Sequence, residues 1–273
     1  MSGDEMSNLT KENLIRMFTE GKRFDGRKLL ETRDIEVSLD VSNQAEGSAR
    51  IKMGKTDVIV GVKMDFGEPY PDSPDKGNLM VTAELLPLAS PRFESGPPGF
   101  GAIELGRLVD RSIRESGMLD LSKLVIKEGE KVWTVMVDIY PINDDGNLID
   151  AATIGAMVAL KNAVMPGIKE NGKVDYDNRT KDKIPLSRDI LPIAFSFFKL
   201  GENLILDPTR EEQEACDSRI TFGISKWGGQ YMINSGQKVG ELPLKREEIE
   251  NITSMLPEKY EEVMKKLKKF LKE

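Results

Sequence analysis

Residues Asp144 to Leu160 read DDGNLIDAATIGAMVAL, a polar turn that passes directly into a run of small and apolar residues. Leu148 and Ile149 fall in the first turn of the predicted helix, where free backbone N–H groups and the helix dipole favour an anion. These two side chains are apolar, so the helix start lacks the cation or hydroxyl that normally completes a phosphate site. Five later positions carry almost no side chain, which lets the helix backbone approach a sheet closely: Ala151, Ala152, Gly155, Ala156 and Ala159.

Three further motifs accompany this segment. Arg23-Phe24-Asp25-Gly26-Arg27 lies near the N-terminus, Glu84 to Pro91 reads ELLPLASP, and Leu206 to Glu212 reads LDPTREE. Taken in order, the four segments resemble the RNase PH family of phosphate-dependent 3′→5′ exoribonucleases, and the resemblance extends over residues 23 to 240. Within that family the chain is similar to the archaeal exosome ring subunit that carries no active site of its own.

The resemblance implies a fold, a role and a set of partners. The expected fold is α/β (α+β), with two strand-then-helix halves of the ribosomal-protein-like βαβα kind and a helix at each end. The implied role is that of a non-catalytic structural and RNA-binding subunit of a ring that degrades single-stranded RNA, with no cofactor. The implied partners are a catalytic RNase-PH-like subunit, which forms heterodimers that close into a hexameric ring, and cap subunits with OB-fold or KH-type domains.

Composition limits the function independently. The chain has 273 residues, 39% hydrophobic and 31% charged, which is typical of a globular protein with a substantial core. It has no histidine, which excludes Ser-His-Asp and Cys-His nucleophile schemes, and its single cysteine, Cys216, suits a reducing cytoplasm. No apolar run is long enough to span a membrane. The net charge of −7 restricts any RNA contact to a local basic stripe.

Hydrophobic periodicity predicts a mixed α/β order of elements. The central strand is expected at 131–140, a hairpin around Gly54-Lys55, and an exposed polar excursion at 169–188. The expected regions are an N-terminal helix in 1–22, a core in 23–240 with halves 23–120 and 121–240, and a C-terminal helix in 241–273. The expected helices are 7–22, 100–116, 148–164 (ended by Pro166-Gly167) and 247–271, and the other strands 34–41, 48–53, 57–66, 78–86, 192–199, 203–206, 219–225 and 230–233.

The start of the Asp144 helix is the first candidate site. Active members of the family carry Gly-Ser-Arg or Gly-Thr-Arg there, whereas this chain has Gly146-Asn147-Leu148. A leucine cannot replace the bidentate, permanently charged guanidinium that holds a phosphate. We therefore expect no phosphate site, and a helix that serves only core packing.

An acidic cluster is the second candidate. In active relatives this region supplies a pair of aspartates, in a Glu-Asp step followed by Ala-Asp. Here the first step reads Glu212-Gln213, and glutamine neither titrates nor binds magnesium well. We expect no catalytic residue and no metal, with the acids instead capping a helical turn after Pro208. The cluster comprises Asp207, Glu211, Glu212, Glu214 and Asp217.

Three arginines in IELGRLVDRSIRES are the third candidate. Arg107, Arg111 and Arg114 fall on one helix face, opposite an apolar stripe. The family counterpart of this helix lines the RNA path, so we expect Arg107 and Arg111 to contact backbone phosphates, with Arg114 contributing less. The alternative is a solvated face with ion pairs, because three acids stand at i,i+3 or i,i+4 spacing to these arginines: Glu104, Asp110 and Glu115.

The loop before this helix completes the prediction. Active ring subunits carry two adjacent arginines there that hold the RNA near its 3′ end, but this loop reads GPPGF at residues 96–100. With the phosphate ligand and one acid also missing, we expect a non-catalytic subunit. Two alternatives are a phosphorolytic exoribonuclease active in its own right, using Asp207, Asp217 and an unrecognised cation, and a small-molecule kinase. The first lacks the required arginine and the second lacks a glycine-rich phosphate loop.

Overall fold

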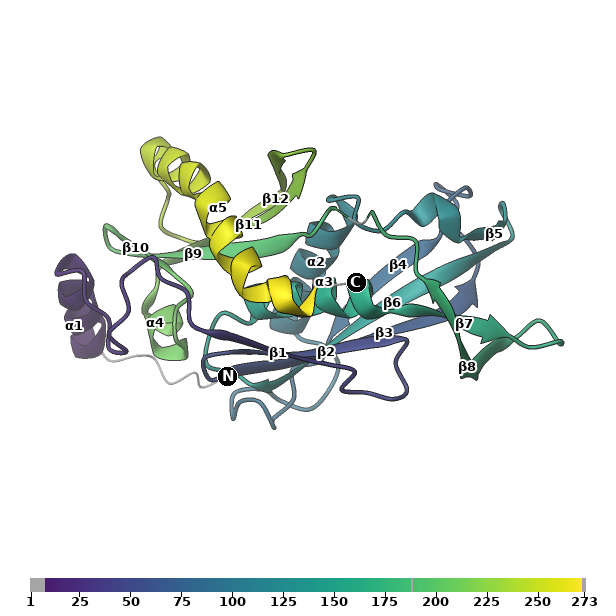
Figure 1. The fold of residues 1–273 in the computed structure, drawn as a ribbon. Helices are drawn as coiled ribbons and strands as arrows, with labels where there is room; N and C mark the ends of the chain where they lie inside the picture. Colours follow the sequence, from purple (N-terminus) through teal and green to yellow (C-terminus); the bar gives the residue numbers. More distant parts are fainter. Residues whose placement is uncertain (1–7, 188, 272–273) are drawn as a thin grey trace.

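The computed structural model describes residues 8–187 and 189–271 (Figure 1). Ser7, where the first predicted helix begins, and Arg188, where the predicted excursion ends, lie outside the described residues. The elements, in chain order, are α1 (Asn8–Thr19), β1 (Ile35–Leu39), β2 (Gly47–Met53), β3 (Thr56–Gly67), β4 (Asn78–Ala83), α2 (Phe100–Arg114), η1 (Leu121–Leu124), β5 (Val125–Lys127), β6 (Lys131–Asn143), α3 (Leu148–Asn162), β7 (Val164–Ile168), β8 (Val174–Lys183), β9 (Ile193–Leu200), β10 (Asn203–Leu206), α4 (Arg210–Ala215), β11 (Ser218–Trp227), β12 (Gln230–Gly240), α5 (Arg246–Leu267) and η2 (Lys268–Phe270).

The larger sheet has six strands in the order β1-β2-β3-β6-β4, with β5 paired to β6. All pairs are antiparallel except β4 with β6. The predicted central position of β6 is confirmed, and so is the hairpin of β2 and β3, whose turn contains Gly54 at a φ of 58°. Because β6 belongs to this sheet, the sheet combines strands from before and after residue 120.

Helices α2 and α3 lie between this sheet and a four-stranded sheet ordered β10-β9-β11-β12 (Figure 1). Helix α3 packs on β2 and β3 on one side and on β9 on the other. Every residue of β9 is buried, because α3 and α5 both pack against it. The expected mixed α/β architecture is therefore observed as a layered arrangement of sheet, helices and sheet.

The small residues of α3 have the predicted effect on packing. A Cβ atom added at Gly155 would meet Cγ2 of Val60 on β3 at 2.7 Å, so only glycine fits there. Ala152 and Ala159 are fully buried about one turn on either side of this contact. The helix backbone therefore lies directly against the six-stranded sheet, which fixes where its N-terminus points.

The prediction that Pro166-Gly167 ends this helix is wrong. The helix ends at Asn162, because Ala163 adopts an extended conformation and the Val164 N–H donates to the carbonyl of Glu46 (3.1 Å). Pro166 and Gly167 lie within β7, which pairs with β8. The segment predicted as an exposed excursion is thus exposed but regular, since β7 and β8 form a two-stranded sheet at the right of Figure 1.

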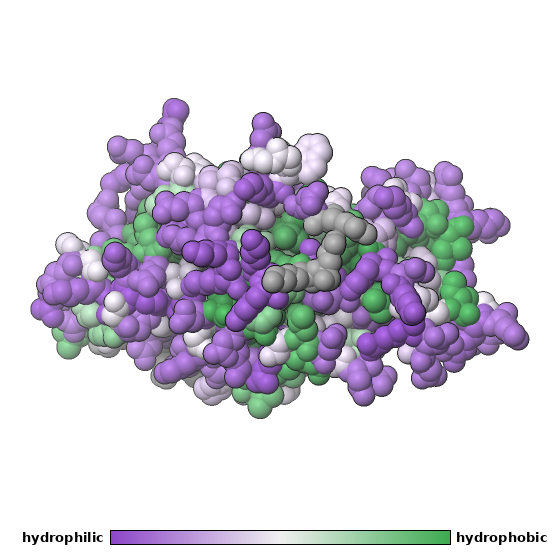
Figure 2. All heavy atoms as spheres, in the orientation of Figure 1, coloured by the Kyte–Doolittle hydropathy of each residue, from purple (hydrophilic) through white to green (hydrophobic). Residues whose placement is uncertain are grey.

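The terminal helices are amphipathic, as predicted. Helix α1 buries Leu14 and Phe18 in a small second core with Phe198 of β9. Helix α5 buries the centre of its predicted stripe, while Ile249 at its start is 36% exposed and Phe270 lies in η2. No described helix is long and apolar enough to cross a membrane. Figure 2 shows that hydrophilic side chains dominate the viewed face, with hydrophobic ones in small groups between them.

Candidate nucleic-acid interface

Helix α2 has the two faces that its sequence predicts. Leu105, Leu108 and Val109 are buried against β4 and α3. The opposite face is open to solvent and presents the three candidate arginines: Arg107, Arg111 and Arg114.

Arg114 is held by protein groups. Its guanidinium pairs with Asp110 at 2.7 Å, four residues earlier, and donates to the carbonyl of Leu79 on β4 at 2.9 Å. This is the i,i+4 ion pair that the solvated-face interpretation expects. The charge of Arg114 is therefore compensated, and its side chain is fixed to the sheet.

The charges of Arg107 and Arg111 are not compensated by an acidic side chain of the described residues. Across residues 8–187 and 189–271, neither forms an ion pair, and Arg111 donates only to the neutral side chain of Gln237 at 3.3 Å. Glu104, which the solvated-face alternative offered as a partner of Arg107, instead pairs with Arg219 of β11 at 2.7 Å. Asp110, which is also spaced to reach Arg107, forms its ion pair with Arg114. The solvated-face interpretation therefore describes one arginine of the three.

The turn that leads into α3 is bound by other groups of the chain. The backbone N–H of Asn147 donates to Oε1 of Gln213 at 2.8 Å, and that of Gly146 donates to Asp144 at 3.1 Å. A Cβ at Gly146 would lie 2.6 Å from the carbonyl oxygen of Pro208. Two backbone donors just before the helix are thus bound by side chains of the chain itself. One of these side chains belongs to Gln213, which the family resemblance places at the position of a catalytic acid.

Arg33 lies buried beneath the same turn. Its guanidinium donates to the carbonyl oxygens of Asp145 (2.9 Å) and Gly146 (3.1 Å), and it pairs with Asp207 at 2.6 Å. Arg33 therefore holds the turn from its buried side, with the Asp207 carboxylate as its counter-ion. No local sequence pattern indicated a role for Arg33, because Arg33 and Asp207 are 174 positions apart.

Asp207 is the buried centre of the acidic cluster. Burial by itself raises the pKa of this carboxyl, but the hydrogen bonds and charge of Arg33 outweigh it and hold the pKa below its usual range. Asn147 Nδ2 and Arg27 Nη1 also donate to it, at 2.9 Å and 3.2 Å. Asp207 therefore acts as a buried counter-ion of Arg33 and Arg27.

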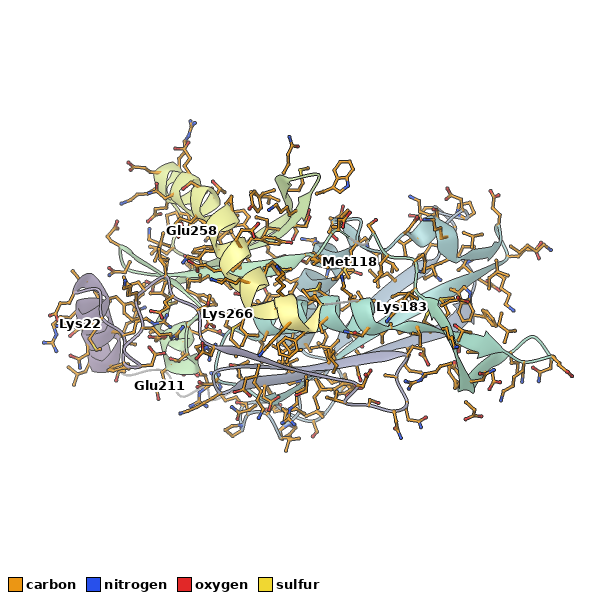
Figure 3. All side chains as sticks on the ribbon, viewed as in Figure 1. Lys22, Met118, Lys183, Glu211, Glu258 and Lys266 are labelled. Atoms are coloured by element: carbon orange, nitrogen blue, oxygen red, sulfur yellow. The ribbon has the colours of Figure 1, made fainter. Side chains whose placement is uncertain are left out.

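The other predicted acids do not converge with Asp207. Glu212 is buried and paired with Arg23, and together with Thr209 it forms the capping box of α4, which confirms the expected cap after Pro208. Asp217 is bound by Lys11 of α1 at 2.5 Å. Glu214 pairs with Arg92 at 2.6 Å, and Glu211 is exposed on α4 (Figure 3). Within the described part of the chain, no group of three potential ligands could hold a metal ion.

Asp150, in the first turn of α3, is a further titratable group that the sequence analysis did not single out. It is buried, and its oxygens accept from Asn147 Nδ2 (2.9 Å), the Ser196 N–H (3.1 Å) and the Ser196 hydroxyl (2.8 Å). Burial raises its pKa to about 7 in spite of these donors. Through its contacts with Ser196, Asp150 anchors the first turn of α3 to β9.

Comparison with known proteins assigns this geometry to a family. Residues 31–166 match the model of the 3′ exoribonuclease family, domain 1 (RNase PH), and residues 191–255 match domain 2 of the same family. Together these matches cover most of the chain. The chain belongs to the RNase PH family of 3′ exoribonucleases.

Its curated relatives are subunits of one complex. The chain is 40% identical over 267 residues to the exosome complex component Rrp42 of Methanothermobacter thermautotrophicus, covering 97% of both chains. It is 45% identical over 226 residues to the Rrp42 component of Archaeoglobus fulgidus, covering 83% of this chain and 84% of that one.

Solved structures agree with these relatives. A chain of the Archaeoglobus fulgidus exosome with RNA bound to the active site superposes with a TM-score of 0.81 at 41% identity, covering 93% of this chain and 98% of that one. A chain of an archaeal exosome core superposes with a TM-score of 0.77 at 38% identity, covering 90% of both. The predicted RNase PH fold is thereby confirmed.

Proposed function

We propose that this chain is a non-catalytic, RNA-binding subunit of an archaeal-type exosome ring. The observation that carries the proposal is the state of the α3 N-terminus. The backbone N–H groups of Gly146 and Asn147, just before the helix, donate to Asp144 and Gln213. Leu148 stands where the family resemblance expects a phosphate-binding arginine.

The absence of catalysis rests on three features of the same region. The phosphate ligand is replaced by Leu148, the acid of the catalytic pair is replaced by Gln213, and the arginine pair before α2 is replaced by a Gly-Pro-Pro-Gly loop. Asp207 is buried and bound by arginines, so it is available neither to a metal nor to a leaving group. Each feature alone would impair phosphorolysis, and together they leave no reacting group.

The contribution to RNA binding rests on Arg107 and Arg111. They lie four residues apart, about one helical turn or ~6 Å along the axis, on an exposed face and without a protein counter-ion among the described residues. In a chain with a net charge of −7, such uncompensated cations are the groups suited to phosphates. Arg114, neutralised by Asp110, adds less to the site.

The proposed partners follow from the relatives. A non-catalytic subunit can contribute by completing the substrate path of a catalytic neighbour. We therefore place this chain in heterodimers with a catalytic RNase-PH-like subunit. Three such heterodimers would close into a hexameric ring, topped by OB-fold or KH-type cap subunits, with single-stranded RNA as substrate and the cytoplasm as compartment. The single cysteine, Cys216, fits such a reducing compartment.

The test of the catalytic half is phosphorolysis. Purified alone, the chain should release no nucleoside diphosphates from poly(A) in phosphate and magnesium, whereas the complex with its catalytic partner should release them. Measurable release by the chain alone that disappears in the Asp217→Ala variant would contradict the proposal. That result would support an exoribonuclease active in its own right.

A further inference from the structure

A chain of polar side chains joins the exposed face of α2 to strand β12. Arg111 Nη1 donates to Oε1 of Gln237 (3.3 Å), and Nε2 of Gln237 donates to Glu104 (3.2 Å). The same Glu104 oxygen accepts from Arg219 of β11 at 2.7 Å. Glu104 and Arg111 are seven residues apart on α2, so Gln237 spans two helical turns between them.

The two ends of this chain fix the orientation of the Gln237 amide. Its oxygen faces a guanidinium, which only donates, and its NH₂ group faces a carboxylate, which only accepts. The flipped amide would oppose donor to donor at Arg111 and acceptor to acceptor at Glu104. The amide therefore has one favourable position, and it presents a fixed acceptor to Arg111.

The tether leaves the charge of Arg111 intact. An amide oxygen orders a guanidinium without neutralising it, whereas a carboxylate at the same distance would cancel the charge that a phosphate needs. Arg114 is the contrasting case on the same face, because Asp110 both holds and neutralises it. Ordering of a long side chain before binding also reduces the conformational entropy lost when the ligand arrives.

The other end of the chain protects Arg107. Glu104 stands three residues before Arg107, a spacing at which the two side chains can pair on a helix. It is turned away instead, toward Arg219, and both members of that pair are largely buried. Strands β11 and β12 thus supply one residue that holds Arg111 and one that removes a competing acid from Arg107.

We propose that Gln237 is a positioning residue for RNA, which presents the Arg111 guanidinium to a backbone phosphate in its fully charged state. Arg219 assists by holding Glu104 away from Arg107. This inference rests on the proposed function, because it assigns a residue that prepares the same RNA-binding face. Gln237 itself reads no base and contacts no reacting atom.

The test measures single-stranded RNA affinity against salt for the complex assembled with variants of this chain. Gln237→Glu should act like Arg111→Gln and lower the slope of log affinity against log salt by about 0.7 per engaged subunit, the value for one lost phosphate contact. Relative to binding near 1 M salt, this corresponds to about 5-fold weaker binding at 0.1 M. The Arg111→Gln/Gln237→Glu double variant should add nothing further, because both changes remove the same contact.

Two variants separate positioning from a general effect. Gln230→Glu makes the same chemical change at the exposed start of β12, away from this network, and should leave the slope unchanged. Gln237→Met keeps the Arg111 charge but removes the tether. It should preserve the slope and weaken binding about 2- to 10-fold, the range expected when one long side chain must be ordered on binding.

The outcomes distinguish this inference from the function on which it rests. A lowered slope in Arg111→Gln, with parental slope in Gln237→Glu and parental affinity in Gln237→Met, overturns the positioning role and leaves the RNA-binding function standing. Parental slopes in Arg111→Gln and Gln237→Glu alike overturn both. If Gln237→Glu fails to assemble, the affinity of Gln237→Met decides alone, since parental affinity there refutes the tether.

Discussion

Replacing Arg33 by methionine tests whether a buried ion pair holds the turn at residues 144–147, just before α3. The change removes the guanidinium that binds Asp207 at 2.6 Å and the carbonyl oxygens of Asp145 and Gly146 at 2.9 Å and 3.1 Å. The Asp207 carboxylate, which has no exposed side-chain surface, then loses its main counter-ion. Breaking one side of such a pair typically costs about 3–5 kcal/mol.

Remaining contacts place the expected cost near the lower end of that range. Arg27 Nη1 and Asn147 Nδ2 still donate to Asp207, at 3.2 Å and 2.9 Å. We therefore expect a loss of about 3 kcal/mol in the free energy of unfolding at pH 7. For a chain of this size, that corresponds to a melting temperature lower by roughly 6–12 °C.

The pH dependence supplies a second signature. The pKa of Asp207 is lowered in the folded chain, so its stabilising contribution is complete above the unfolded pKa of about 4 and is lost as the pH falls. In Arg33→Met, burial raises the pKa of Asp207, and protonation relieves the unpaired charge. The difference between parent and variant should therefore shrink as the pH falls from 7 toward 4.

Urea denaturation at several pH values measures both effects. Arg246→Met, which removes an exposed arginine paired with Glu250, is the control and should change little. Arg33→Met/Asp207→Asn should recover part of the stability, because the unpaired charge is gone. An Arg33→Met chain within 1 kcal/mol of the parent at pH 7 would refute the buried-pair reasoning.

Two further predictions concern α3. The pKa of Asp150 is raised to about 7, so the stability that this residue adds is complete below pH ~4 and is lost as the pH rises through 7. In Asp150→Asn, the melting temperature should therefore depend less on pH between pH 5 and pH 8. A pH dependence equal to that of the parent would contradict this. Gly155→Ala should destabilise the chain by about 1–3 kcal/mol, because its Cβ would lie 2.7 Å from Val60 Cγ2, and a thermal melt with no loss would show that the helix can shift away from β3.

Much of the fold could be predicted because its signals are local. The apolar stripe of α2 and the small residues of α3 appear within single segments, and both elements lie where those patterns indicate. The end of α3 could not be read in the same way. The helix stops at Asn162 because the following backbone joins Glu46, which lies more than a hundred positions earlier, and the nearby Pro166-Gly167 pair was a misleading local signal.

The sequence shows which of the family's site residues are missing, but not which contacts take their place. The missing arginine at Leu148 and the missing acid at Gln213 can be read directly from the motifs. That Gln213 then binds the helix start depends on contacts between distant segments, as does the occupation of Asp207 by Arg33. The pairing of Glu104 with Arg107 that the alternative interpretation offered does not form for the same reason, because Arg219 of β11 binds that acid instead.

The contribution of this chain to RNA degradation is tested most directly by phosphorolysis in the assembled complex with Arg107→Gln/Arg111→Gln. Degradation of long single-stranded RNA should slow, because two phosphate contacts away from the reacting bond are lost. Substrates of two or three nucleotides, too short to reach α2, should be degraded at close to the parental rate. Arg114→Gln, which removes an already neutralised arginine, is the control and should have the smaller effect. Equal rates for parent and double variant on long RNA would contradict a subunit that binds the strand without cleaving it.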